Sequence, residues 1–272
     1  MCSSDLDEGV RRSVSTVALL SIICGLLLMV IGVAVSRPIL ELIDTPADVL
    51  DLAVLYLRIY FIGIPFFLIF NFGSAILRSV GDTRRPLYIL VVAGVINTIL
   101  NLIFVIGLGM SVEGVAIATA IANAISAFLI IRLLRREPGA LQLNLKHLKL
   151  HSKELRRMLQ IGVPAGLQGM VFSFSNVVVQ SAINGYGASA IAGSAAALNF
   201  EFYCYFIVVA FNGAAISFIG QNYGARKYDR VRRIYRICMT LAVCGCMVAN
   251  GLLVWQDRFF LSLFSKIGRA HV

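Results

Sequence analysis

The sequence has few charged residues. Asp, Glu, Lys and Arg make up only 14% of its 272 residues, whereas 59% are hydrophobic and the mean hydropathy is +0.86. A soluble domain is about 25% charged and covers its core with polar side chains. This composition excludes an ordinary soluble domain and indicates that lipid surrounds most of the folded chain.

The sequence also lacks the pattern of a metal, redox or disulfide site. It has three histidines, none of them in an apolar run, and six cysteines without a repeating spacing. Cys244 and Cys246 are two residues apart, which places their thiols on different faces of a helix. Without a nucleophile or metal constellation inside the apolar runs, no enzyme is expected.

The apolar residues fall into runs that are each long enough to cross a bilayer core, which takes about 20 residues in a helix. The seven runs are 13–36, 54–77, 87–109, 112–131, 158–184, 189–219 and 234–255. The sequence therefore predicts an all-α, multi-pass transmembrane protein.

Positive charge is concentrated in alternate connections. Nineteen of the 24 Lys and Arg residues lie before the first run, in 78–86, in 132–157, or in and just after 220–233. The positive-inside rule predicts that these loops are cytoplasmic. We expect the membrane to be a bacterial plasma (inner) membrane. Because the basic residues are spread over loops and not gathered in one soluble domain, no nucleic-acid partner is expected.

The first and last runs resemble each other. Val10-Arg11-Arg12 aligns with Val231-Arg232-Arg233, and the ungapped alignment continues at an offset of 221 residues. The two copies are six helices apart and so cross in the same direction, which is typical of parallel repeats in transporters. We expect a 12-helix, two-lobe parent in which 7–131 forms the last four helices of the first lobe, 132–157 the cytoplasmic interlobe linker and 158–266 the first three helices of the second lobe.

The two ends of the chain do not fit this pattern. Residues 2–6 read CSSDL and residues 267–272 read IGRAHV, and each resembles the translation of a common sequencing adapter. We expect 1–6 and 267–272 to be adapter artefacts that do not belong to the native fold.

Three stretches resemble the multidrug and toxic compound extrusion (MATE) family. They are LRSVGDTRRP at 77–86, IGVPAGLQ at 161–168 and GQNYGA at 220–225, in the family's order and spacing. The resemblance suggests an internal fragment of such a transporter, lacking both ends. It implies a secondary active transporter that exports drugs or organic cations by H+ or Na+ antiport, through alternating access of two lobes.

A lipid or lipid-linked oligosaccharide flippase of the same superfamily is the alternative function. Its cavity should carry cationic residues for pyrophosphate, whereas the polar groups of 87–109, 158–184 and 189–219 are amides, hydroxyls and one acid. The exporter is therefore favoured. Its expected partners are a cationic or amphipathic small molecule and the lipid bilayer, with no oligomer required and no cofactor besides the coupling ion, H+ or Na+.

Glu201 is the candidate cation-coupling residue. It is the only acid well inside an apolar run, and a carboxylate at the bilayer centre costs about 2.5–3.5 kcal/mol on insertion scales unless it is neutralised or partnered. A reversible H+ or Na+ would neutralise it; a hydrogen bond to a neighbouring helix is the structural alternative. Sodium-coupled members of the family carry an acid one turn after the proline of the second motif, but 158–184 contains no carboxylate.

Amide side chains are the candidates for lining a substrate cavity. Asn176, Gln180 and Asn184 recur every four residues and so share one face of a helix, and Asn97 and Asn101 form a similar pair. Such amides either line a cavity without charge or tie helices together. The complete set of cavity-lining candidates is Asn97, Asn101, Gln168, Asn176, Gln180, Asn184 and Asn199.

Glu201→Gln in a full-length parent should abolish or strongly weaken coupled export while leaving membrane insertion intact. Glutamine keeps the shape of the side chain but cannot exchange a proton or neutralise Na+. Efflux driven by a proton or sodium gradient in proteoliposomes, at equal protein density, measures the effect. Wild-type coupling in the variant would assign Glu201 a structural role.

Overall fold

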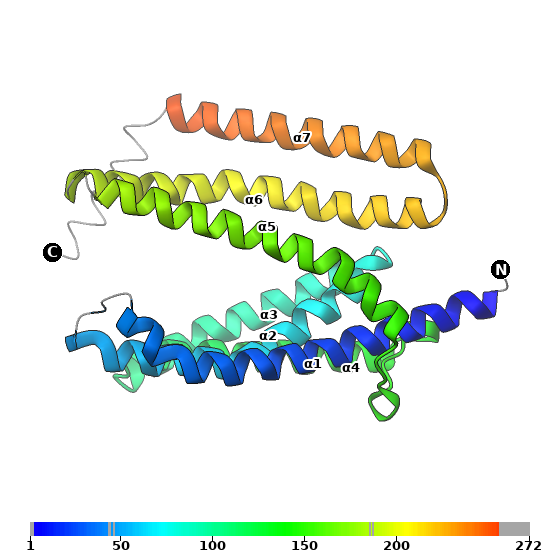
Figure 1. Cartoon of the computed structure of the whole chain (residues 1–272), viewed down its shortest axis with the longest axis horizontal. Coiled ribbons are helices and arrows are strands. Elements are labelled where there is room, and N and C mark those ends of the chain that lie inside the picture. Colours follow the sequence, from blue (N-terminus) through cyan, green and yellow to red (C-terminus); the bar gives the residue numbers. More distant parts are fainter. Residues whose placement is uncertain (1–2, 43–44, 46, 185, 187, 256–272) are drawn as a thin grey trace. The chain divides into compact units, whose positions relative to one another are not determined.

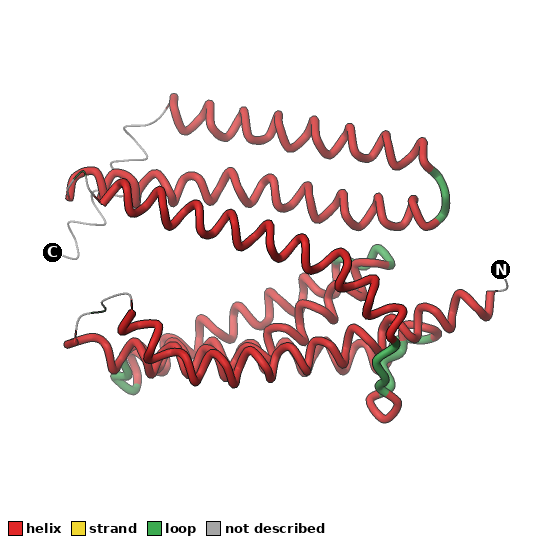
Figure 2. Tube along the Cα trace, in the orientation of Figure 1, coloured by secondary structure: helices red, strands yellow, loops and turns green. Residues whose placement is uncertain are grey.

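The chain folds almost entirely into helices joined by short loops. The computed structural model describes residues 3–42, 45, 47–184, 186 and 188–255 (Figures 1 and 2). The long helices are α1 (Ser3–Leu42), α2 (Ala47–Ser79), α3 (Arg84–Asn101), α4 (Val112–Arg136), α5 (Ser152–Asn184), α6 (Ala188–Gly224) and α7 (Tyr228–Trp255). A π-helical segment, η1 (Leu102–Gly107), extends α3.

Seven helices of the described chain are long and apolar enough to cross a membrane. The predicted all-α, multi-pass class is therefore confirmed. Most helices run beyond the predicted apolar runs; α1, for example, begins at Ser3 and ends at Leu42, where hydropathy alone marks 13–36. Hydropathy reports the part of a helix that suits lipid, whereas the helix itself continues into polar sequence.

The chain divides into two compact units, Met1–Leu159 and Gln160–Val272. In the second unit α6 packs along α7, and the boundary between the units falls within α5. In the first unit α1 packs along α2, and α4 packs along both α2 and α3. Close approach in the first unit depends on small residues: a Cβ on Gly25 of α1 would lie 2.7 Å from Cα of Pro65 on α2. Small residues at such crossings are how helices pack in lipid, where apolar contact alone gives little drive.

The segment between α4 and α5 is folded against the first unit. Leu143 is buried in a cluster with Leu134 of α4 and Leu77 of α2, and its N–H donates to the Leu134 carbonyl at 3.0 Å. Ser15 of α1 bonds the backbone of Lys149 twice, accepting from its N–H at 2.8 Å and donating to its carbonyl at 3.1 Å. We call residues 137–151 the strap, because hydrogen bonds tie Leu143 to α4 and Lys149 to α1. In Figure 1 the strap is the loop that leads from α4 to α5.

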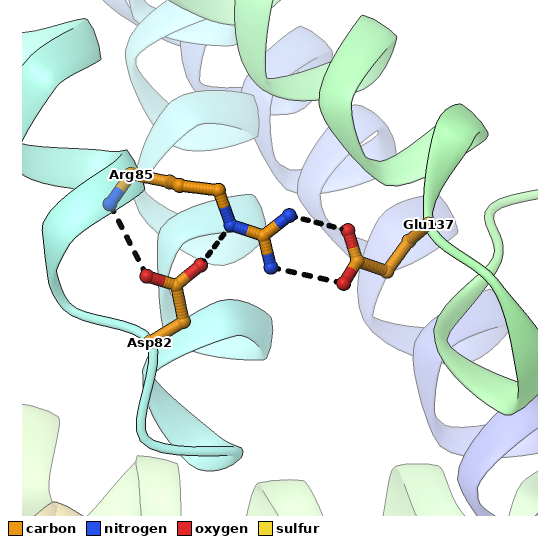
Figure 3. A network of polar contacts seen from close by, with 3 residues as sticks. All are labelled: Asp82, Arg85 and Glu137. Atoms are coloured by element: carbon orange, nitrogen blue, oxygen red, sulfur yellow. Dashed lines mark hydrogen bonds and ion pairs between the residues drawn. The ribbon is translucent and has the colours of Figure 1, made fainter.

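Arg85, in the first turn of α3, joins that helix to the strap and to the preceding loop (Figure 3). Its Nη1 and Nη2 donate to the two carboxylate oxygens of Glu137 at 2.7 and 2.9 Å. Its Nε donates to Asp82, and its backbone N–H donates to Oδ1 of Asp82 at 3.2 Å. Such bidentate, charge-assisted hydrogen bonds are among the strongest in proteins. We call Asp82, Arg85 and Glu137 the clamp.

The clamp changes the titration of Asp82. Burial by itself would raise the pKa of this carboxyl, but hydrogen bonds from Arg85 and the charge of its guanidinium outweigh burial and hold the pKa below its usual value. A carboxylate with a lowered folded pKa stabilises the fold above its unfolded pKa, and the stabilisation disappears as the pH falls through the folded value.

Glu137→Gln should lower the stability of the first unit by about 1–3 kcal/mol. The Glu137 side chain is only 14% exposed, and loss of its charge would leave Arg85 paired with Asp82 alone. Glu41→Gln is the matched control: Glu41 also pairs with an arginine, Arg37, but both side chains are about half exposed, so its loss should cost less than about 0.5 kcal/mol. The apparent melting temperatures of the purified chains in detergent measure both effects. Equal shifts would contradict a stabilising clamp.

Asp82→Asn should destabilise the chain at pH 7 but lose its effect in acid. The wild-type advantage should be complete above the unfolded carboxyl pKa of about 3.9 and shrink as the pH falls below about 4. Melting temperatures of both chains between pH 3 and pH 7 measure this. An advantage that does not change with pH would show that Asp82 acts as a neutral hydrogen-bond acceptor only.

Candidate functional site

A cavity of about 580 Å³ lies between α2, α3 and α4 in the first unit. At one end it reaches the basic loop between α2 and α3, where Arg78, Thr83 and Pro86 line it. At the other end it reaches Asn97 and Thr119. Thr83 and Asn97 are 14 residues apart on the chain, or about 20 Å along a helix at 1.5 Å per residue, so the cavity extends well into the apolar part of the unit.

The wall of the cavity is apolar with isolated neutral hydrogen-bonding groups. Phe67 and Phe70 of α2 and Leu87 and Leu90 of α3 supply much of its surface. The polar groups come from all three helices: Asn71 from α2, Asn97 from α3, and Thr119, Asn123 and Ser126 from α4. Arg78 is the only charged residue in the wall as far as the structure describes it.

A chain of side-chain hydrogen bonds holds the deep end of the cavity. Asn101 donates from Nδ2 to Oδ1 of Asn97 at 3.1 Å, and Asn97 donates from Nδ2 to the Thr119 hydroxyl at 3.4 Å. Thr119 in turn donates to the Val115 carbonyl at 2.9 Å. The predicted pair on α3 therefore does lie on one face, and it connects α3 to α4.

One acceptor in this series of hydrogen bonds is unused. Among the described residues, Oδ1 of Asn101 is buried without a hydrogen-bond partner. A buried amide oxygen without a partner is costly, and water or a bound ligand could satisfy it. Asn101 itself is not in the cavity wall and reaches it only through Asn97.

The remaining predicted residues belong to the second unit. Gln168 and Asn176 lie exposed on α5, and Gln180 is half-buried on the same helix. Asn199 and Glu201 lie exposed on α6. The side chain of Asn184 lies outside the part of the chain that the structure describes. Their proposed roles stay predictions.

The aromatic side chains beside Glu201 are also exposed. Phe202 and Tyr203 follow it on α6 and are 55% and 63% exposed. The helix therefore presents a carboxylate among large apolar groups on an open face of the second unit. Nothing in the described part of this unit explains the carboxylate as part of a packed core.

Among the neutral polar residues that the three helices contribute to the cavity wall, sequence reasoning missed Asn71, Thr119, Asn123 and Ser126. Asn71 and Asn123 are single amides in otherwise apolar runs, so they show none of the four-residue spacing that marks the amides of α5. Their position inside a membrane span was the available signal, because a polar side chain in hydrocarbon needs a partner or a cavity.

A comparison with known proteins agrees with the motifs. The family model MatE matches residues 7–103 and 164–270. Probable multidrug resistance protein YoeA of Bacillus subtilis is 29% identical over 266 residues, which cover 95% of this chain and 57% of the relative. Probable multidrug resistance protein YpnP of the same organism is 34% identical over 209 residues, covering 74% and 44%.

The fold agrees as well. A crystal structure of MATE in complex with MaD5 matches with a TM-score of 0.85 at 21% identity, over 96% of this chain and 62% of that one. The chain spans about half the length of the two curated relatives. Since the family model covers well over half of the sequence, the chain belongs to the MatE family, whose members are membrane transporters and not enzymes.

Proposed function

We propose that this chain forms part of a secondary active exporter that moves drugs or organic cations out of the cell in exchange for H+ or Na+. The observation that carries the proposal is the cavity of the first unit, which combines apolar and aromatic walls with neutral amides and hydroxyls. Multidrug export is also the activity in the names of several relatives.

The cavity suits an amphipathic cation by size and chemistry. Its volume of about 580 Å³ falls within the range of about 300–1,000 Å³ that is usual for small-molecule sites. Phe67 and Phe70 belong to its wall, and the faces of aromatic rings attract cations. The amides of Asn97 and Asn123 can turn to donate or accept, which suits a site that binds several substrates without a fixed charge pattern.

The basic loops give the cavity a direction. If 78–86, 132–157 and 220–233 face the cytoplasm of a bacterial plasma membrane, as the positive-inside rule predicts, then Arg78 and Thr83 stand at the cytoplasmic mouth. Substrate would enter beside the clamp and move toward Asn97. The clamp holds α3 and the end of α4 in place at that mouth.

Coupling is assigned to a different unit from substrate binding. The described cavity wall contains no acid, and Glu201 of α6 is the one carboxylate well inside a span of the sequence. Protonation or Na+ binding there would remove the cost of a charge in lipid and so favour one conformation over the other. Alternating access of two lobes would turn that preference into export.

The cavity does not favour a flippase. A site for a pyrophosphate-linked lipid should gather several cationic side chains, but Arg78 is the single cation in the described wall. The exporter is therefore the only function that we propose.

Asn97→Leu should weaken binding of a fluorescent amphipathic cation to the purified chain by about five- to tenfold, the equivalent of one lost hydrogen bond. Leucine has a similar volume and removes the amide, together with its hydrogen bonds to Asn101 and Thr119. Thr98→Leu is the matched control: Thr98 is next on α3, exposed and outside the cavity wall, and its hydroxyl bonds the Gly94 carbonyl of its own helix. Fluorescence anisotropy titration measures both affinities.

The result separates the cavity from general binding to the apolar surface. Equal affinities for Asn97→Leu and wild type, or equal losses in the two variants, would exclude this cavity as the substrate site. In a full-length parent, Asn97→Leu should lower gradient-driven efflux of the same cation in proteoliposomes. Full efflux in that variant would overturn the role proposed for the cavity.

A further inference from the structure

A second, smaller hollow lies on the outside of α4 at its basic end. It has a volume of about 300 Å³ and is lined by Phe128, Ile131, Arg132, Arg135 and Arg136. We call it the arginine groove. It is separate from the cavity between α2, α3 and α4, with which it shares no lining residue.

The apolar and the charged residues of the groove follow each other along α4. Phe128 lies one turn before Arg132, and Arg135 and Arg136 lie one turn after it, so all four occupy one side of α4. Phe128 and Arg136 are eight positions apart, which corresponds to about 12 Å along the helix axis. The apolar wall is therefore on the side of the membrane interior, and the guanidinium groups are at the end of the span.

The three arginines are exposed, and no ion pair engages them within the described chain. The acid next to them in sequence, Glu137, has both carboxylate oxygens bonded to Arg85 and only 14% of its side chain exposed. The clamp thus occupies the carboxylate that lies nearest to these arginines in the sequence. Three positive charges face outward beside an apolar wall.

We propose that the arginine groove binds a phospholipid with an anionic headgroup from the surrounding bilayer. The phosphate would lie among Arg132, Arg135 and Arg136, which form fork-like hydrogen bonds with phosphate, and the first part of an acyl chain would lie along Phe128 and Ile131. Phospholipids have this same order of charge and apolar surface along the membrane normal. The site is independent of the transported substrate.

Retention of lipid by the 272-residue chain in a mild detergent tests the proposal, with native mass spectrometry as the readout. Phosphatidylglycerol should be retained in preference to phosphatidylcholine with the same acyl chains. Arg132→Gln combined with Arg135→Gln should weaken phosphatidylglycerol retention by about 25-fold, since each arginine near an anionic lipid contributes about fivefold.

A charge-matched variant separates the groove from general surface charge. Arg11→Gln combined with Arg84→Gln removes two other exposed arginines of the first unit and should leave retention close to wild type. An equal loss in this variant would overturn the proposal. Phe128→Ala should weaken the binding of phosphatidylglycerol but not that of glycerol phosphate. If glycerol phosphate displaces the lipid at equal concentration, the groove is an anion site without a lipid component, and the proposal is overturned.

The test does not depend on the double variant folding. Circular dichroism at 222 nm reports whether it retains the helical content of the wild type. If the double variant loses helical content, lipid retention by the wild-type chain is measured at increasing salt concentration. Its preference for phosphatidylglycerol should fall as salt is raised, because the contact is between exposed charges. A wild-type chain that retains both lipids equally at low salt would overturn the proposal.

Discussion

The structure depends on one constraint: hydrocarbon offers no water to a polar group, so the backbone N–H and C=O groups of a membrane span must find their partners inside the protein. The long helices satisfy the backbone. Small polar side chains follow the same rule by bonding the turn before them, as Ser36 does with the Gly32 carbonyl at 2.5 Å and Ser126 with the Ala122 carbonyl at 2.9 Å. Amides have more donors and acceptors than one turn can satisfy, so they must meet across helices or face a cavity. Asn97 does both, and this excess capacity is the origin of the candidate site.

Outside the hydrocarbon the means of holding helices together changes. Within the spans, contact relies on small residues, such as Gly73 of α2, where an added Cβ would lie 2.7 Å from the Ile130 side chain of α4. At the basic ends, where water is available, charges and loops hold the helices instead. There the clamp joins α3 to the end of α4, and the strap joins α4 to α1. The cavity between α2, α3 and α4 can stay open because its mouth is held from outside and its deep end by hydrogen bonds.

The sequence predicts those features that depend on local pattern. The seven spans and the shared face of Asn97 and Asn101 follow from hydropathy and helical period. It does not predict the strap, because the contact of Ser15 with Lys149 joins residues 134 positions apart, and no local signal marks either of them. Nor does it single out Asn71 and Asn123 for the cavity wall, since an isolated amide could equally bond its own helix, as Asn71 also does with the Phe67 carbonyl.

The arginines show what the structure adds to the charge pattern of the sequence. The positive-inside rule counts arginines without distinguishing them, yet the arginines at one membrane face play different roles here. Arg85 is committed to two carboxylates and helps to define the fold. Because that commitment occupies Glu137, the arginines of α4 remain without an acidic partner in the described chain. The ion pairs of Arg85 therefore occupy Glu137 and leave the arginines of α4 available to anions from outside the protein. Orientation in the membrane needs only the total charge, whereas binding at this face depends on which arginines the fold has already used.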